Sequence, residues 1–188
     1  MTPEMLNLQW NAVSLYPAGY FVRQIPFKPT VTFPKDWQVY TALDGQKRTG
    51  DTVTWSKVDY EQLVDSPIFA GKHARQWDLG HNVKLDVVAD EAKDLELAPE
   101  HLAAFKKLVE EGLAAHGAFH FDHYDFLVAL SDKLGGIGLE HQRSNESSLE
   151  PESFIKWQAK DWDRNVIAHE FNHSWDGKFR RPADLWTP

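Results

Sequence analysis

His169-Glu170-Phe171-Asn172-His173 reads H-E-x-x-H and lies near the end of the 188-residue chain. On a helix, residues four apart lie on the same face, so both imidazoles can reach one metal ion. Histidine nitrogens bind Zn²⁺ at about 2.0–2.1 Å. Glu170 then projects beside the ion, where it can accept a proton from water. The pattern predicts His169 and His173 as zinc ligands and Glu170 as a general base; the alternative is a surface helix with two unconnected histidines.

The residues that flank the motif predict a helix of about three turns, over roughly 164–176. Asp161 and Asp163 are candidate N-caps, and their charge suits the positive end of the helix dipole. Gly177 suits the first position beyond the helix, and Pro182 follows it. The apolar residues of this helix are expected to form one surface, which comprises Val166, Ile167, Phe171 and Trp175.

Composition excludes several classes of protein. The chain carries 28 acidic and 20 basic residues, a net charge of −8, which argues against a general nucleic-acid binder. It has no cysteine, so histidine and carboxylate side chains must supply any transition-metal ligands. No apolar window approaches about 18 residues, so no membrane span is predicted. The N-terminal residues lack a signal-peptide pattern, and the location stays open between cytoplasm and periplasm.

Residues 1–80 predict a β-rich unit whose role is support, because none of its residues has catalytic spacing. Residues 60–67 read as a single helical turn that ends before a proline. Short β-branched and aromatic runs separated by turn residues predict the strands of this unit. These runs are Gly19–Val22, Val31–Phe33, Trp37–Tyr40 and Val53–Trp55.

From about residue 82 the pattern changes to longer elements. Val83–Val88 alternates as a strand does, and Phe121–Leu130 reads as a second strand that becomes more apolar toward its end. Between them, Pro99 can open a helix over 100–116, and Gly117 can end it. The apolar stripe of this helix is expected to belong to the core, and it comprises Leu102, Phe105, Val109 and Leu113.

A glycine-rich run, residues 135–138, leads into Leu139 and Glu140 and predicts an edge strand beside the metal. Such an edge offers unpaired backbone groups, so a peptide can add to it as an extra strand and lie across the ion. Glu140 would lie at the end of that groove, where a carboxylate can bind a cationic amine; otherwise it is an ordinary exposed acid. The polar residues 143–152 predict a loop.

Other candidate ligands are weaker. His120 and His123 fall on a predicted strand, where residues three apart face opposite sides. The longer pattern H-E-x-x-H-x-x-G-x-x-H fails, because Asp176 and Phe179 stand where its glycine and last histidine belong. No glutamate follows His173, so a third ligand from a later helix is not found among these residues. Asp176 either approaches the metal or caps the helix.

Three segments resemble the glycyl aminopeptidase family of zinc metallopeptidases, which belongs to the gluzincin clan. The first is 167–178 with Arg181-Pro182 and Leu185-Trp186. The second is Gly136-Ile137-Gly138-Leu139-Glu140-His141 with Ser144, and the third is Asp65-Ser66-Pro67. The family's corresponding segment reads G-G-L-E-H-x-x-S, so the spacing of the glycines at Ile137-Gly138 is a departure. The order of the motifs matches the family along most of the chain.

The resemblance implies an α+β fold. Residues 1–80 would form the C-terminal part of a β-sandwich-like domain, and 81–188 the N-terminal β/α lobe of a thermolysin-like metallopeptidase domain. The chain would then be an internal fragment of a larger enzyme. A third zinc ligand, a glutamate, is implied in a segment after Trp186, and family members often carry a PDZ domain near the C-terminus.

The resemblance also implies roles for the matched residues. His169 and His173 would bind one zinc ion, and Glu170 would act as general base and later as proton donor. Glu140 would receive the free amino group of a peptide substrate, beside the backbone of Gly138 and Leu139 on the edge strand.

Three functions remain to be distinguished. The first is a zinc-dependent aminopeptidase that removes N-terminal Gly- or Ala-type residues from peptides. The second is a non-catalytic peptide-binding module that uses the edge strand, and the third is a structural domain whose histidines never bind metal. We expect the first for the parent enzyme. We expect little or no peptidase activity from these 188 residues alone, because two histidines without a third ligand bind zinc weakly.

Overall fold

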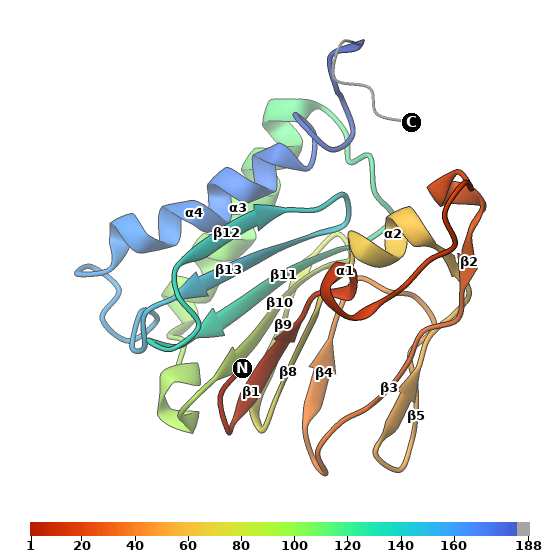
Figure 1. The fold of residues 1–188 in the computed structure, drawn as a ribbon. Helices are drawn as coiled ribbons and strands as arrows, with labels where there is room; N and C mark the ends of the chain where they lie inside the picture. The colour runs from red at the N-terminus through yellow and green to blue at the C-terminus, as the bar shows by residue number, and fades with distance from the viewer. Residues whose placement is uncertain (184–188) are drawn as a thin grey trace.

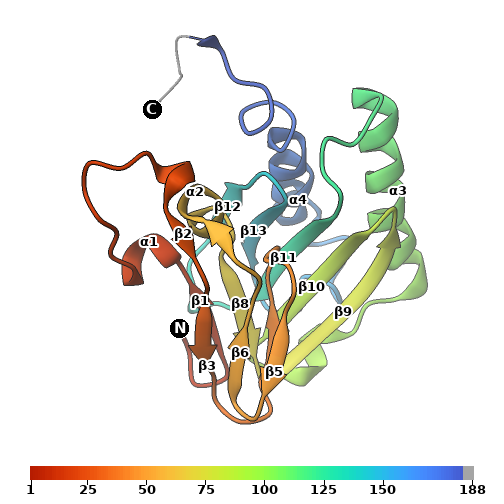
Figure 2. The same cartoon turned by 90° about the vertical axis from the view of Figure 1, so that its right-hand side faces the viewer.

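The computed structural model describes residues 1–183 and has an α+β fold with several β-sheets. Short strands dominate the N-terminal part, whereas the C-terminal part combines a five-stranded sheet with two long helices (Figures 1 and 2). The N-terminal elements are β1 (Met5–Leu8), α1 (Trp10–Val13), η1 (Val22–Gln24), β2 (Pro26–Phe27), β3 (Thr30–Thr32), β4 (Gln38–Tyr40), β5 (Lys47–Thr49), β6 (Thr52–Thr54), β7 (Val58–Asp59), α2 (Tyr60–Val64) and β8 (Ile68–Gly71).

The later elements build the sheet that carries the site. They are β9 (His73–Gly80), β10 (Val83–Ala89), η2 (Ala92–Leu95), α3 (Pro99–His116), β11 (Tyr124–Leu130), β12 (Ile137–Glu140), β13 (Ser144–Leu149) and α4 (Asp161–His173). The strand order is β12-β13-β11-β10-β9. β10, β11 and β13 run parallel, while β9 and β12 are antiparallel to their neighbours. β12 therefore lies at an edge, as the glycine-rich run predicts.

Both faces of this sheet are covered, and β11 shows how. All seven of its residues are buried. Side chains alternate along a strand, so Phe126 and Val128 join the core under the two long helices, whereas Leu127 and Ala129 face the other side. There they meet Met5 and other residues of the sheet β1-β8-β4. Figure 1 shows α3 and α4 on one side of the strands and β1, β8 and β4 toward the other.

The two long helices touch through a glycine. A side chain added at Gly112 of α3 would come within 2.7 Å of the Phe171 ring of α4, so only glycine permits this approach. Helix α3 begins with Pro99 and ends at Gly117, which has φ +79° and donates its N–H to the Leu113 carbonyl. Both bounds follow the sequence prediction, because proline and glycine act through local backbone geometry.

The predicted loop over 143–152 is wrong for most of its length. β13 is an interior strand, and Ser144, Asn145, Glu146 and Ser147 are fully buried. Two of these side chains have partners: the Asn145 amide N–H donates to the Ile167 carbonyl of α4, and Glu146 accepts from residues of the N-terminal part. The hydroxyls of Ser144 and Ser147 have no hydrogen-bond partner among the described residues. Polar composition predicted exposure, but the hydrogen bonds of Asn145 and Glu146 offset the cost of burying these two side chains.

The N-terminal predictions have mixed outcomes. Strands β3, β4 and β6 and the helical turn α2 lie where the sequence predicts them. The strand predicted over Gly19–Val22 is wrong, because Gly19 adopts φ +87° in a turn and Tyr20 and Phe21 remain exposed.

The chain passes from the N-terminal sheets to the five-stranded sheet after β8, because β9 pairs with β10. The domain division at residue 80 stays a prediction. No helix within residues 1–183 is both long and apolar enough to cross a membrane.

Candidate metal centre

Helix α4 presents different side chains to the core and to solvent. Ile167 and Phe171 are 1% exposed and pack into the core, as predicted. His169, two positions from each of them, is exposed, and His173 is partly exposed. The helix therefore buries its apolar stripe and holds the two histidines on an accessible face.

The ends of α4 differ from the sequence prediction. The helix covers Asp161–His173, so Asp161 and Asp163 lie in its first turn and no side chain caps it. Arg164 supplies the anchor instead: it is 7% exposed, donates to the carbonyls of Ser153 and Trp157, and lies 3.7 Å from the Trp157 ring centre. These contacts hold the start of the helix against the preceding segment.

The two motif histidines converge. The Nε2 atoms of His169 and His173 lie 3.1 Å apart, and the rings meet at 81°. The Nδ1 atom of His173 lies 3.0 Å from the Asp176 carbonyl oxygen, so Nδ1 carries the proton and donates it. This hydrogen bond leaves Nε2 with a free lone pair, the arrangement that metal-binding histidines commonly use.

Glu170 lies between α4 and the edge strand. It is 6% exposed, and burial, together with the charge of Glu140, raises the pKa of its carboxyl despite the opposing effect of the histidines. A side chain at Gly138 would overlap both the Glu170 carboxylate and Val166. The glycine at this position is therefore required for the close contact of β12 with α4.

The edge strand turns alternate residues toward α4. Gly138 abuts the helix, and Glu140, two residues on, lies on the same side of the strand. Glu140 is partly buried at the last position of β12. The side chain of Leu139 points the other way, into a hollow shared with Asn7 and Gln9. The structure therefore brings Gly138 and Glu140 together with the motif, while Leu139 contributes backbone only.

The weaker candidates have other contacts. His120 and His123 precede β11 rather than lying on a strand. His120 donates from Nε2 to Ser174, whereas His123 contacts Asp44 and Asp125. Asp176 is exposed and offers His173 its carbonyl, not its carboxylate. The matched residues Leu185 and Trp186, like any segment beyond them, lie outside the described residues.

One set of residues carries a role that the sequence reading did not assign. His141, which follows Glu140, is 4% exposed and lies 3.1 Å from both Asp65 and Glu146. Asn7 and Gln9 donate to Glu146 from β1 and the residue after it. The E-H dipeptide and the Asp-Ser-Pro motif were visible in the sequence, but nothing local pairs residues 76 positions apart.

The donor set fits zinc. Among residues 1–183, one group of at least three His, Asp or Glu side chains can hold a metal ion, and it consists of His169, Glu170 and His173. Their candidate ligand atoms lie within 4.8 Å of one another. Two imidazole nitrogens with a neighbouring carboxylate suit Zn²⁺, which accepts nitrogen and oxygen ligands in a tetrahedral arrangement.

Solved structures with similar folds are aminopeptidases and related hydrolases. An aminopeptidase N family protein from Idiomarina loihiensis aligns with TM-score 0.71 and 20% identity, over 95% of this chain and 32% of that chain. Native yeast LTA4 hydrolase aligns with TM-score 0.57 and 17% identity, over 94% and 29%. The same yeast enzyme in complex with bestatin aligns with TM-score 0.55 and 17% identity, over 93% and 29%. The chain thus spans about a third of these structures and shares their thermolysin-like fold.

Family comparison adds sequence evidence to this fold. No curated protein sequence matches the chain. The model of the peptidase M61 N-terminal domain matches residues 1–72, which end one residue before β9, and the model of the M61 glycyl aminopeptidase matches residues 162–188, which contain the motif. Since both models describe one family and match in chain order, this chain belongs to the M61 glycyl aminopeptidase family.

Proposed function

We propose that the chain carries part of the active site of a zinc-dependent aminopeptidase, which removes N-terminal Gly- or Ala-type residues from peptides. The observation that supports this most is the convergence of the His169 and His173 Nε2 atoms, 3.1 Å apart, beside the Glu170 carboxylate. The family membership supports the reaction class. As part of the same proposal, a third ligand comes from outside the described residues, and the parent enzyme carries a PDZ domain.

His169 and His173 would hold the zinc ion through Nε2. When bound, the ion supplies Lewis acidity to the scissile carbonyl and to water. Asp176 orients His173, because its carbonyl oxygen accepts a hydrogen bond from the Nδ1–H of that ring. This backbone contact fixes the tautomer without adding charge beside the ion.

Glu170 moves the proton. It accepts a proton from the attacking water as the new C–O bond forms, and it delivers that proton to the leaving amine as the C–N bond breaks. Its contact with Gly138 holds the carboxylate between α4 and β12. Because Glu170 is 6% exposed, bulk water has little access to the proton that it carries.

β12 orients the peptide. Its outer edge is not paired within the five-stranded sheet of the described residues, so a substrate backbone can add to it. Glu140 lies at its end and would bind the free amino group by a charge-assisted hydrogen bond. An anchor for the amine at one fixed place limits cleavage to the first peptide bond.

The test combines zinc titration with one conservative substitution. We expect one zinc per wild-type enzyme, and a Glu170→Gln variant that keeps its zinc but loses turnover by about 10²–10⁴-fold, because the proton carrier is gone. Unchanged turnover in this variant would refute the mechanism.

The exposed edge of β12 favours a second function, a peptide-binding module without catalysis. It predicts peptide binding that is independent of zinc, together with no turnover in the wild type. Calorimetric titration of a Gly- or Ala-peptide, with and without zinc, distinguishes the two functions.

A further inference from the structure

The turn after β12 is held by a buried ionic network that reaches across the molecule. His141 lies between Asp65, at the end of α2, and Glu146 of β13, at 3.1 Å from each carboxylate. Both ring nitrogens therefore have an acceptor, and the doubly protonated imidazolium satisfies both. Glu146 is fully buried, and Asn7 and Gln9 donate to it.

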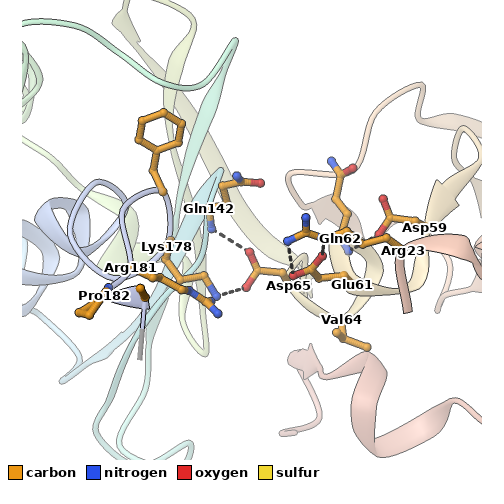
Figure 3. Close-up of a pocket in the computed structure, with 12 residues that line it drawn as sticks. Arg23, Asp59, Glu61, Gln62, Val64, Asp65, Gln142, Lys178, Arg181 and Pro182 are labelled. Atoms are coloured by element: carbon orange, nitrogen blue, oxygen red, sulfur yellow. Dashed lines mark hydrogen bonds and ion pairs between the residues drawn. The ribbon is translucent and has the colours of Figure 1, made fainter. Parts of the chain in front are cut away.

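Asp65 also fixes the backbone of this turn. Its second carboxylate oxygen accepts the N–H of Gln142 at 2.8 Å, and Lys178, from the segment after α4, pairs with its first oxygen. Figure 3 shows Asp65 pointing toward Gln142 and Lys178. These three residues line a cavity of about 680 Å³. The carbonyl of Gln142 accepts from Ser174, the residue that follows His173.

The consequence for the site is geometric. Glu140 immediately precedes His141, which Asp65 of the N-terminal part and Glu146 of β13 hold from two sides. The next residue, Gln142, is held by Ser174 at the end of α4. β12 itself is four residues long and pairs only with β13 in the sheet of the described residues, so these contacts reinforce its end.

We propose that His141 is a positioning residue of the peptidase site, and that Asp65 and Glu146 hold it so that Glu140 meets the amino group of the peptide. This inference rests on the proposed aminopeptidase function. It assigns the N-terminal β-rich part a share in substrate binding, through Asp65, Asn7 and Gln9, although none of these residues lies in the motif.

The charges around His141 agree with this arrangement. Burial alone would lower the pKa of its imidazole, but the hydrogen bonds and charges of Asp65 and Glu146 outweigh burial and raise it. The same imidazolium, with Lys178, lowers the pKa of Asp65 against the effect of burial. Glu140 and Glu170 are the other acids of this region, so a neutral His141 would leave four carboxylates with fewer cations among them.

The first test is kinetic and uses the zinc-loaded enzyme. We expect Asp65→Asn to raise KM for a peptide with a free amino group about tenfold, the cost of a lost charge-assisted hydrogen bond, with kcat changed much less. In a Glu140→Gln background the same substitution should add almost nothing to KM, because both act through one contact. Independent, additive effects of the two substitutions would overturn the proposal.

The matched control is Asp90→Asn. Asp90 is also a hydrogen-bonded carboxylate, with Ser131 and Lys133 as partners, but it lies at the opposite end of the sheet. We expect its KM to equal that of the wild type. A KM increase equal to that of Asp65→Asn would attribute the effect to general loosening of the fold.

The second test does not need turnover. An NMR titration of the His141 ring, assigned with a His141→Gln variant, should give a midpoint above that of an ordinary histidine, because a carboxylate lies beside each ring nitrogen. In Asp65→Asn the titration midpoint of this ring should fall. A wild-type midpoint at or below that of an ordinary histidine overturns the proposal, whereas a wild type that binds zinc without turnover overturns the proposed function.

Discussion

The protein holds two kinds of histidine site, and their partners distinguish them. His169 and His173 are accessible, and their Nε2 atoms face each other without a carboxylate partner among the hydrogen bonds of the described residues. His141 is 4% exposed and has a carboxylate on each ring nitrogen. The first arrangement suits the capture of an ion, and the second suits a permanent charge that fixes the structure. Exposure and pairing, not residue type, decide what a histidine does here.

The largest expected effect follows from removing one of the two carboxylates beside His141. Glu146→Ala leaves His141 with one carboxylate partner and leaves the Asn7 amide without its acceptor, while Gln9 keeps only its bond to Asn7. We expect the free energy of unfolding to fall by about 3 kcal/mol or more, the usual cost of breaking a buried ion pair. Urea denaturation measures it. Glu150→Ala, an exposed neighbour, should change stability by less than about 0.5 kcal/mol; equal effects would mean that the network contributes little.

The next prediction concerns the accessible motif histidines, His169 and His173. His169→Ala or His173→Ala should weaken zinc binding by more than about 100-fold, because losing a direct ligand exceeds the usual effect of losing its hydrogen-bond partner. Competition against a chromophoric chelator measures the affinity. His123→Ala removes a histidine that contacts Asp44 and Asp125 and should keep wild-type affinity. If all three variants bind zinc alike, the metal lies elsewhere.

A smaller effect is expected at Gly138, which contacts Glu170. Gly138→Ala puts a methyl group into the Glu170 carboxylate and Val166, and should lower the free energy of unfolding by about 1–3 kcal/mol through overpacking. Turnover should fall as well, since Glu170 must move. Gly136→Ala is the matched control, because a side chain there meets nothing within 4 Å. Thermal unfolding and peptide turnover of both variants provide the comparison.

The smallest expected effect is a pH dependence of the unfolding free energy, which arises from His141 and not from the motif histidines. Since the folded pKa of His141 is raised, its stabilising contribution is complete below the unfolded pKa of about 6.5 and is lost as pH rises through the folded pKa. The unfolding free energy should therefore decline above neutral pH, and His141→Gln should remove this part of the slope. Denaturant midpoints at several pH values measure it, and identical slopes in both proteins would contradict the assignment.

How much the sequence predicts depends on the range of the interactions. The spacing of His169 and His173 and the bounds of α3 follow from local helix geometry, so both were predictable. The alternation of β10 and the apolar run of β11 also carry their own signal. β13 was not predictable, because its burial depends on partners such as Asn7, which lies 139 positions away from Glu146. The same range hides the link from Asp65 to His141.

That 139-residue separation also bears on how the chain folds. Glu146 cannot be buried favourably until Asn7, Gln9 and His141 surround it, so β13 should dock late, after the N-terminal part has formed. On the ribosome, Asn7 and Gln9 cannot bind Glu146 until residue 146 has emerged from the exit tunnel. Such distant pairing slows folding and leaves the edge of β11 temporarily open to other chains.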